Sequence, residues 1–259
     1  MNYETILFEV GDGIARLTLN RPNVFNAFNE QQSTDVIDAL KNCEKDKSIR
    51  VLILTGAGKA FCSGQDLKSI SGSKRSLSDS LYKRYNPMIR LMRNLPIPII
   101  CQLNGVAAGA GCSLALASDM IIASENASLI EVFINVGLVL DSGSSYFLPR
   151  LVGSARAFEL ATMGSKVSAQ QALDWGMINK VVKAEELDIE VQKAAEYYQK
   201  APTKAIALMK KMLNKSFYSD LETMLEYEAY CQEIAGRSED YKIGVAAFVE
   251  KRKAEFKGQ

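Results

Sequence analysis

Two glycine-bearing segments and one aspartate could together carry out proton transfer beside a stabilised anion. The segments are Phe61-Cys-Ser-Gly-Gln-Asp-Leu67 and Asn104-Gly-Val-Ala-Ala-Gly-Ala-Gly111, the second of which leads into a predicted helix. Amides exposed by a glycine turn or at a helix N-terminus attract negative charge, and two that converge on one oxygen form an oxyanion hole. From spacing alone, an oxyanion hole and two glycine turns that serve tight packing are equally favoured.

Asp141 is the candidate proton carrier, in the run Gly137-Leu-Val-Leu-Asp141-Ser-Gly-Ser-Ser-Tyr146. Aspartate is also a favoured helix N-cap, and the small polar residues that follow it are typical of a helix start. From the residues alone the N-cap interpretation is slightly favoured, and the two roles can coexist.

The sequence excludes several other catalytic classes. It contains no histidine, which removes Ser-His-Asp and Cys-His catalysis and most zinc sites, so we expect no metal. The turn Gly56-Ala-Gly58, after a predicted strand, has neither the third glycine of a dinucleotide-binding loop nor the Gly-Lys-Ser/Thr ending of a P-loop. Neither nucleotide fingerprint is therefore present.

Composition and charge are those of an ordinary globular protein. The 259 residues are 47% hydrophobic, and this length fits one α/β domain with a smaller appendage, or two modest domains. Thirty-one basic and 30 acidic residues give a net charge of +1 without long single-sign blocks, which gives no support to binding of nucleic acid or an anionic membrane.

The cysteines and the first residues indicate the cytoplasm. Five cysteines are scattered without CxxC spacing, which favours free thiols in a reducing compartment, and acidic residues stand where a signal peptide has a basic segment. Residues 94–118 carry no charge, but prolines, glycines, Gln102 and Asn104 interrupt them. We therefore expect a buried strand, turn and helix there and no membrane span.

The elements that must position the site alternate between strand and helix. Strands are predicted at residues 5–10, 14–20, 51–55, 98–103 and 120–123, with a hairpin around 11–13. Helices are predicted at residues 29–43, 80–95, from Gly109 onward, and at 186–200, 203–215, 221–235 and 241–256. This order predicts an α/β core with crossover units on parallel strands over residues 1–190 and a helical module over residues 191–259. The polar loop 69–79 is either a surface connection or a lid over a ligand.

Together these segments resemble the crotonase (enoyl-CoA hydratase/isomerase) superfamily across nearly the whole chain. The matching motifs are Asn20-Arg-Pro22, Asn26-Ala27, the two glycine-bearing segments, Val167-Ser-Ala-Gln-Gln-Ala-Leu-Asp-Trp-Gly176 and Gly244-Val-Ala-Ala-Phe-Val-Glu-Lys-Arg252. The resemblance implies a spiral α/β core with a C-terminal helical module and an acyl-CoA thioester substrate. It also implies no cofactor beyond the coenzyme A of the substrate, and a homotrimer or a hexamer of two trimers.

The resemblance further implies which residues bind the thioester. The backbone amides of Gln65 and Ala110 would hold its carbonyl oxygen. Coenzyme A would contact Val24, Ser63, Asp66, Leu67 and Lys68, with Phe248 and Lys251 reaching in from a neighbouring subunit. Asp66 is also interpreted as a local structural acceptor.

The acids decide the reaction class. Hydratases of the family use two glutamates, at positions matching Ser113 and Phe133 here, and each absent acid removes a contribution of about 10²–10⁴ in rate. Asp141 matches the acid of enoyl-CoA Δ3-Δ2 isomerases and of ring-epoxide phenylacetyl-CoA isomerases, so the resemblance implies an isomerase that shuttles one proton. Glu131, two residues before Phe133, is a candidate accessory acid. The alternatives are an enoyl-CoA hydratase of fatty-acid β-oxidation and a non-catalytic relative that binds coenzyme A or RNA.

Overall fold

A six-stranded sheet forms the centre of the computed structural model, which describes residues 3–70 and 76–259. Its strand order is β1 (Ile6–Gly11), β2 (Ile14–Leu19), β3 (Val51–Gly56), β5 (Ile99–Leu103), β7 (Met120–Ser124) and β10 (Lys180–Val182). The first two strands form the predicted antiparallel hairpin, and the others pair in parallel. The continuous apolar run of β3 is buried along its whole length, as expected for a strand covered on both faces.

A second, four-stranded sheet was not predicted. It consists of β4 (Ala60–Cys62), β6 (Val106–Ala108), β8 (Ser128–Ile130) and β9 (Lys166–Ser168). The first three of these strands follow β3, β5 and β7 along the chain, so that each turn of the chain adds one strand to each sheet. Three-residue strands are too short to show an alternating pattern, which is why the sequence did not reveal them.

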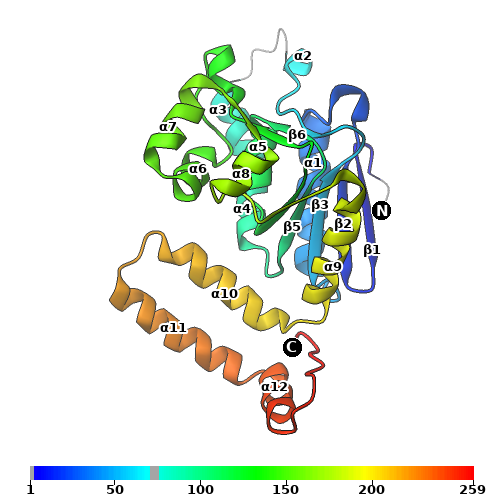
Figure 1. The fold of residues 1–259 in the computed structure, drawn as a ribbon, viewed down its shortest axis with the longest axis vertical. Coiled ribbons are helices and arrows are strands. Elements are labelled where there is room, and N and C mark those ends of the chain that lie inside the picture. The colour runs from blue at the N-terminus through cyan, green and yellow to red at the C-terminus, as the bar shows by residue number, and fades with distance from the viewer. Residues whose placement is uncertain (1–2, 71–75) are drawn as a thin grey trace.

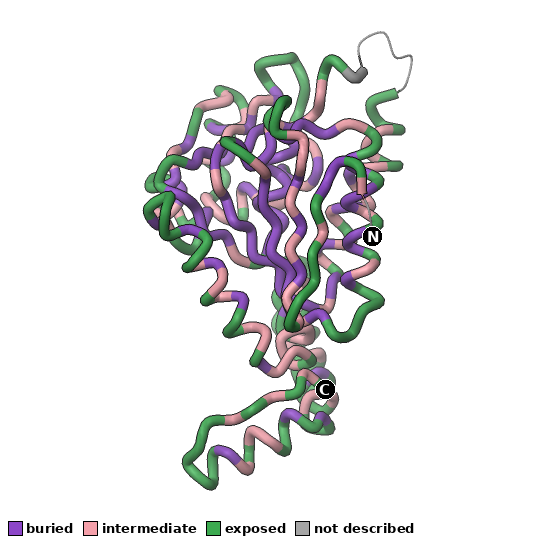
Figure 2. Tube along the Cα trace, turned by 90° about the vertical axis from the view of Figure 1, so that its right-hand side faces the viewer, coloured by how far each residue is buried: buried purple, intermediate pink, exposed green. Residues whose placement is uncertain are grey.

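Helices cover both faces of the large sheet (Figure 1). On one face, α1 (Glu30–Lys45) and α4 (Asn86–Asn94) pack against each other and over core residues such as Leu52 and Leu54. On the other face, α9 (Leu187–Gln199) covers the alternate residues Val51 and Ile53. Figure 2 shows the resulting band of buried backbone through the sheet. A π-helical turn, η2 (Leu81–Tyr85), leads into α4.

The remaining short elements surround the second sheet. They are η1 (Pro22–Val24), α2 (Leu67–Ile70), α3 (Leu77–Ser80), α5 (Ala110–Leu116), η3 (Val132–Val136), α6 (Ser144–Val152), α7 (Ser154–Met163), α8 (Ala169–Asp174) and η4 (Ala184–Glu186). The predicted helix from Gly109 onward is α5, every residue of which is buried. This small helix therefore lies at the centre of the molecule.

The C-terminal helices form an arm that extends from the core (Figure 1). They are α10 (Thr203–Ser216), α11 (Leu221–Gly236) and α12 (Glu239–Val249). The predicted division at residue 190 falls inside α9, which packs on the sheet through Val191 and Ala195. The fold is the predicted α/β core with a C-terminal helical module.

The last predicted helix, residues 241–256, is wrong in its extent. Helix α12 ends at Val249, and the chain turns back so that the Asp240 carboxylate accepts hydrogen bonds from the amides of Lys257 (2.6 Å) and Gly258 (2.8 Å). These bonds stabilise the returning segment instead of a further helical turn. Among the helices that the structure describes, none has the length and apolar character to cross a bilayer.

Candidate active site

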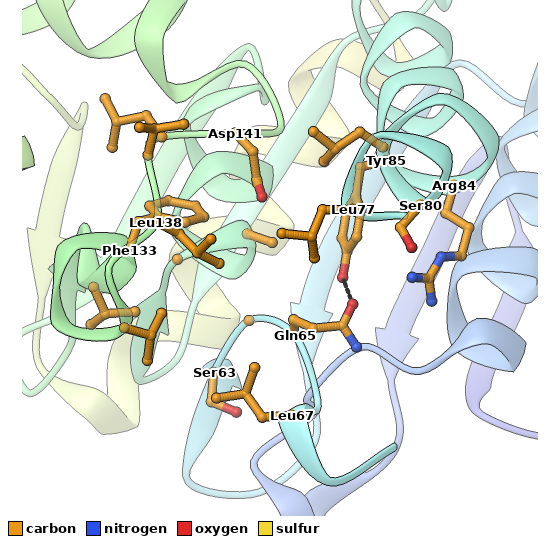
Figure 3. A pocket seen from close by; sticks show the side chains of 18 of the residues that line it. Ser63, Gln65, Leu67, Leu77, Ser80, Arg84, Tyr85, Phe133, Leu138 and Asp141 are labelled. Atoms are coloured by element: carbon orange, nitrogen blue, oxygen red, sulfur yellow. Dashed lines mark hydrogen bonds between the residues drawn. The ribbon is translucent and has the colours of Figure 1, made fainter. Parts of the chain in front are cut away.

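A cavity of about 800 Å³ brings together the predicted amides and acid (Figure 3). Gln65, from the segment after β4, and Ala110, at the start of α5, lie on its wall with Asp141, from the loop before α6. Apolar side chains from η3 and the loop after it form another part of the wall, among them Phe133 and Leu138. The cavity therefore collects residues from strand ends, helices and loops that lie far apart in the sequence.

Two glycines in unusual backbone conformations aim the two amides. Gly64 has φ +92°, and a Cβ atom on it would lie 2.7 Å from the Ala108 carbonyl oxygen and 3.4 Å from the Ala110 nitrogen. The segments that carry Gln65 and Ala110 therefore touch. Gly109, with φ +52°, is the residue before α5 and turns the chain into the helix. Glycine is required at Gly64 because any side chain would separate the two segments.

Neither amide is used by the surrounding backbone ladder. In the parallel bridge between Phe28 and Gln65, the bonds are made by the Gly64 carbonyl, which accepts from the Phe28 amide, and by the Asp66 amide. Ala110 is the first residue of α5, where an N–H has no partner within the helix. Two N–H groups on adjoining segments of the cavity wall can therefore both donate hydrogen bonds to one oxyanion.

The Gln65 side chain is held on both sides. Tyr85, buried at the end of η2, donates a 2.6 Å hydrogen bond to Gln65 Oε1, and Gln65 Nε2 donates to the Phe28 carbonyl at 2.8 Å. Burial raises the pKa of the Tyr85 hydroxyl, so it remains a donor. Sequence reasoning did not assign Tyr85 to the site, because the π-helical turn that directs it into the cavity carries no sequence pattern of its own.

Asp141 points into the cavity (Figure 3). Burial raises its pKa, and the Ser142 hydroxyl, which donates a 2.7 Å hydrogen bond to Asp141 Oδ1, lowers it by a smaller amount. Ser142 and Gly143 both have left-handed backbone angles, φ +52° and +90°. The N-cap interpretation is wrong, because Gly143 is the N-cap residue of α6 and no side chain caps the helix.

The two positions that the resemblance matches to the hydratase glutamates hold side chains without acid–base chemistry at neutral pH. Phe133 forms part of the apolar wall. Ser113 is fully buried in α5, where its hydroxyl lies 2.7 Å from the Ser144 hydroxyl and 3.1 Å from the Asp141 carbonyl oxygen. Both sites are thus filled by groups that pack or hydrogen bond.

Glu131 lies behind the cavity wall. It is 3% exposed, and within the described residues it is not among those that line the cavity. Its Oε1 atom accepts a 2.9 Å hydrogen bond from Ser144, and burial raises its pKa to about 7. The structure therefore places the candidate accessory acid outside the cavity lining, whereas the next residue, Val132, belongs to the lining.

The predicted coenzyme A residues fall into two groups. Ser63 and Leu67 line the cavity, and Ser63 Oγ donates to the Val24 carbonyl at 3.3 Å, while Lys68 is exposed in α2. Asp66 forms an ion pair with Arg21 at 3.1 Å, in keeping with a structural acceptor. Of the predicted loop 69–79, residues 71–75 lie outside the described part of the chain.

The other two coenzyme A residues are on the arm. Phe248, in α12, is 86% exposed, and Lys251 follows in the turn with φ +54°. Neither belongs to the cavity of its own chain as the structure describes it. Their contribution from a neighbouring subunit stays a prediction.

Comparison with known proteins agrees with this geometry. The family model described as enoyl-CoA hydratase/isomerase matches residues 9–259. The 1,2-epoxyphenylacetyl-CoA isomerase of Escherichia coli (strain K12) is 43% identical over 99% of both chains, and the crotonyl-CoA hydratase of Syntrophomonas wolfei is 33% identical over 99% of both. A crystal structure of an enoyl-CoA hydratase from Bacillus anthracis superposes with a TM-score of 0.94, at 31% identity over 99% of this chain and 100% of that one. The chain therefore belongs to the enoyl-CoA hydratase/isomerase family, the crotonase superfamily of acyl-CoA enzymes.

Proposed function

We propose that this protein is an acyl-CoA isomerase that moves a proton with the single carboxylate Asp141. The observation that carries the proposal is that Asp141 lines the same cavity as Gln65 and Ala110. Phe133 and Ser113 occupy the positions where hydratases carry their acids. Isomerisation is the family reaction that needs one acid and no water.

The proton would leave and return on the same carboxylate. Asp141 removes a proton from the carbon next to the thioester carbonyl of a 3-enoyl-CoA, and the electron pair moves onto the carbonyl oxygen between the two amides. The Asp141 carboxylic acid then returns that proton two carbons away, the double bond shifts into conjugation, and the thioester carbonyl is restored. No atom is gained or lost.

The raised pKa of Asp141 suits both halves of this cycle. Burial raises it, which makes the carboxylate a stronger base and brings its affinity for a proton closer to the operating pH. The wall beside it is apolar and includes Phe133 and Leu138, and these side chains offer no group that would activate a water molecule.

The test is Asp141→Asn, which keeps the shape of the side chain and removes its basicity. We expect kcat on a linear 3-enoyl-CoA to fall by about 10²–10⁴, the usual contribution of a general acid–base group. Glu30→Gln is the matched control, because Glu30 is the other carboxylate on the cavity wall and is exposed at the start of α1. Isomerase activity that survives in Asp141→Asn at the wild-type level would show that another group moves the proton.

The substrate is proposed at two levels. Acyl-CoA thioesters follow from the family, and a ring-epoxide phenylacetyl-CoA is favoured by the 43% identical relative named for that substrate. A hydratase remains the competing candidate, because a relative named crotonyl-CoA hydratase is 33% identical. Turnover of ring-epoxide, linear 3-enoyl and crotonyl thioesters by the wild type, measured side by side, distinguishes the three, and dominant hydration of crotonyl-CoA would overturn the proposal.

We further infer a homotrimeric or hexameric assembly in which the arm completes a neighbouring site. Supporting this, α12 exposes Phe248 (86%) and Val249 (73%), apolar side chains with no cover in the single chain as described. Light scattering measures the mass in solution. A monomer that turns over substrate at full rate would contradict this assembly.

A further inference from the structure

A buried row of hydroxyls connects Glu131 to the loop that carries Asp141. Glu131 Oε1 lies 2.9 Å from Ser144 Oγ, and Ser144 Oγ lies 2.7 Å from Ser113 Oγ. Ser113 Oγ in turn lies 3.1 Å from the Asp141 carbonyl oxygen and 3.2 Å from that of Gly109. Ser113 and Ser144 are both fully buried, so each hydroxyl proton has only these partners to choose from.

The number of protons decides which way this row points. If Glu131 is a carboxylate, Ser144 donates to it, and the single Ser113 proton is divided between the Ser144 oxygen and the Gly109 and Asp141 carbonyls. If Glu131 carries a proton on Oε1, it donates to Ser144 and Ser144 donates to Ser113. The Ser113 proton is then left for the two carbonyls alone, and that of Asp141 is the nearer at 3.1 Å.

The protonated arrangement makes one more hydrogen bond than the ionised one. It ends on the main chain of Asp141, which otherwise accepts only from the Ser144 amide at 3.0 Å among the bonds that the structure describes. Ser113 belongs to α5, the same helix that presents the Ala110 amide. The additional bond therefore connects the catalytic loop directly to the helix of the oxyanion hole.

We propose that Glu131 is a positioning residue whose proton directs the Glu131–Ser144–Ser113 row and thereby fastens the main chain of Asp141 to α5. This inference rests on the proposed role of Asp141. It gives Glu131 no contact with substrate. When Glu131 ionises, Ser144 turns its proton to Glu131 and becomes a competing acceptor for Ser113, at 2.7 Å, so the fastening bond is weakened.

The surroundings of Glu131 favour a proton there near neutral pH. Burial is the main cause that raises its pKa to about 7, and its Oε2 atom has no hydrogen-bond partner among the described residues. The titratable groups that face it are the Cys112 thiol of α5, itself held neutral by burial, and Asp141, whose negative charge raises the pKa of Glu131 further. The Ser144 hydroxyl and the Cys112 thiol act in the opposite direction and lower this pKa, and burial outweighs both.

The first test is the pH profile of kcat in Glu131→Gln. Glutamine donates through Nε2 at all pH values, so it imitates the protonated acid. We expect wild-type kcat to fall about two- to tenfold as pH rises through the pKa of Glu131, the value of one hydrogen bond, and Glu131→Gln to lack this fall. A fall that persists unchanged in Glu131→Gln overturns the proposal.

Two serine variants separate positioning from general packing. Ser113→Ala removes the last hydroxyl of the row. At every pH its kcat should therefore equal the reduced value that the wild type reaches at high pH. Ser118→Ala is the matched control, because Ser118 is also buried and its hydroxyl has no partner within the described part of the chain. The pH profile of kcat in Ser118→Ala should follow that of the wild type. If kcat of Ser113→Ala still falls at alkaline pH, the proposed role of the Glu131–Ser144–Ser113 row is wrong.

A stability measurement keeps this inference distinct from the proposed function. A carboxyl whose pKa is raised on folding binds more protons in the folded state, so the free energy of unfolding should fall as pH rises from about 5 to about 8, relative to Glu131→Gln. Asp141→Asn removes a charge that raises the pKa of Glu131, so it should move this titration to lower pH without abolishing it. If Asp141→Asn keeps full activity, the proposed function fails even though Glu131 titrates, whereas titration of Glu131 without a change in kcat refutes positioning alone.

Discussion

The Tyr85 hydroxyl and the Gln65 side-chain oxygen are 2.6 Å apart, and this hydrogen bond joins helix η2–α4 to the segment that presents one oxyanion amide. Gln65 is thereby held by its side chain while its backbone N–H faces the cavity. The oxygen that develops charge in the reaction would meet a donor whose position is set before the substrate binds.

Tyr85→Phe should therefore lower kcat about three- to tenfold with little change in KM. The variant keeps the ring and its edge-to-face contact with Phe28, at 5.8 Å between ring centroids, and removes one buried hydrogen bond. Steady-state kinetics on a 3-enoyl-CoA measure both constants. A rise in KM at constant kcat would instead assign Tyr85 to substrate binding.

Gly64→Ala should abolish the oxyanion hole. Its Cβ would meet the Ala108 carbonyl oxygen at 2.7 Å, which forces apart the segments that carry the two amides, and loss of one oxyanion donor costs about 10²–10³ in kcat. Gly137→Ala is the control for backbone strain alone, since Gly137 has φ +69° and nothing within 4 Å of its Cβ position. Equal losses in the two variants would show that strain and not the hole is responsible.

The acid limb of the pH profile should report Asp141. Its pKa is raised by burial, so kcat/KM should fall with decreasing pH at a higher pH than an ordinary aspartate, about 3.9, would give. Ser142→Ala removes the hydroxyl that lowers the pKa and should move this limb to still higher pH. The measurement is kcat/KM from pH about 4 to about 7 in both proteins. If the acid limb of this profile lies at the same pH in Ser142→Ala and in the wild type, Asp141 is not its origin.

Lys210→Met should loosen the arm without touching the cavity. The Lys210 ammonium, on α10, donates to the carbonyls of Met92 (2.9 Å) and Ile97 (3.2 Å) and to Asp119 (2.6 Å). Methionine leaves the buried Met92 and Ile97 carbonyls without this donor, whereas the exposed Asp119 keeps the Ile99 amide and Arg93. The unfolding free energy should fall by about 1–3 kcal/mol. Urea denaturation measures the loss, and limited proteolysis should cut first near α10. Lys211→Met, at an exposed neighbouring position, is the control and should leave both measurements unchanged.

The sequence predicted β1, β2, β3, β5 and β7 of the large sheet and the helices α1, α4 and α9 that cover it, because their patterns are long, whereas the three-residue strand β10 was not predicted. The apolar run of β3 and the spacing in α1 extend over enough residues to show a period. The three-residue strands of the second sheet and the end of α12 depend on contacts between distant segments, such as Asp240 with Lys257, which no local pattern records.

For the site, the sequence identified the groups and could not identify their connections. Gln65, Ala110 and Asp141 were named from motifs, and the structure brings all three to one cavity. Tyr85 and the row from Glu131 to Ser113 went unrecognised, because hydrogen bonds between elements 20 residues and 31 residues apart arise only from packing.

Helix α5 and the apolar part of the cavity wall differ in burial, and this difference determines where mutations can change substrate specificity. Ala110 and Ser113 share one small helix that is buried throughout, whereas Val136 and Val139, on the apolar wall, are 54% and 83% exposed. Mutations at the wall therefore change the shape offered to an acyl group while the catalytic frame is inherited intact. Random libraries confined to residues 134–139 should yield folded variants with altered chain-length preference far more often than libraries of equal size in α5.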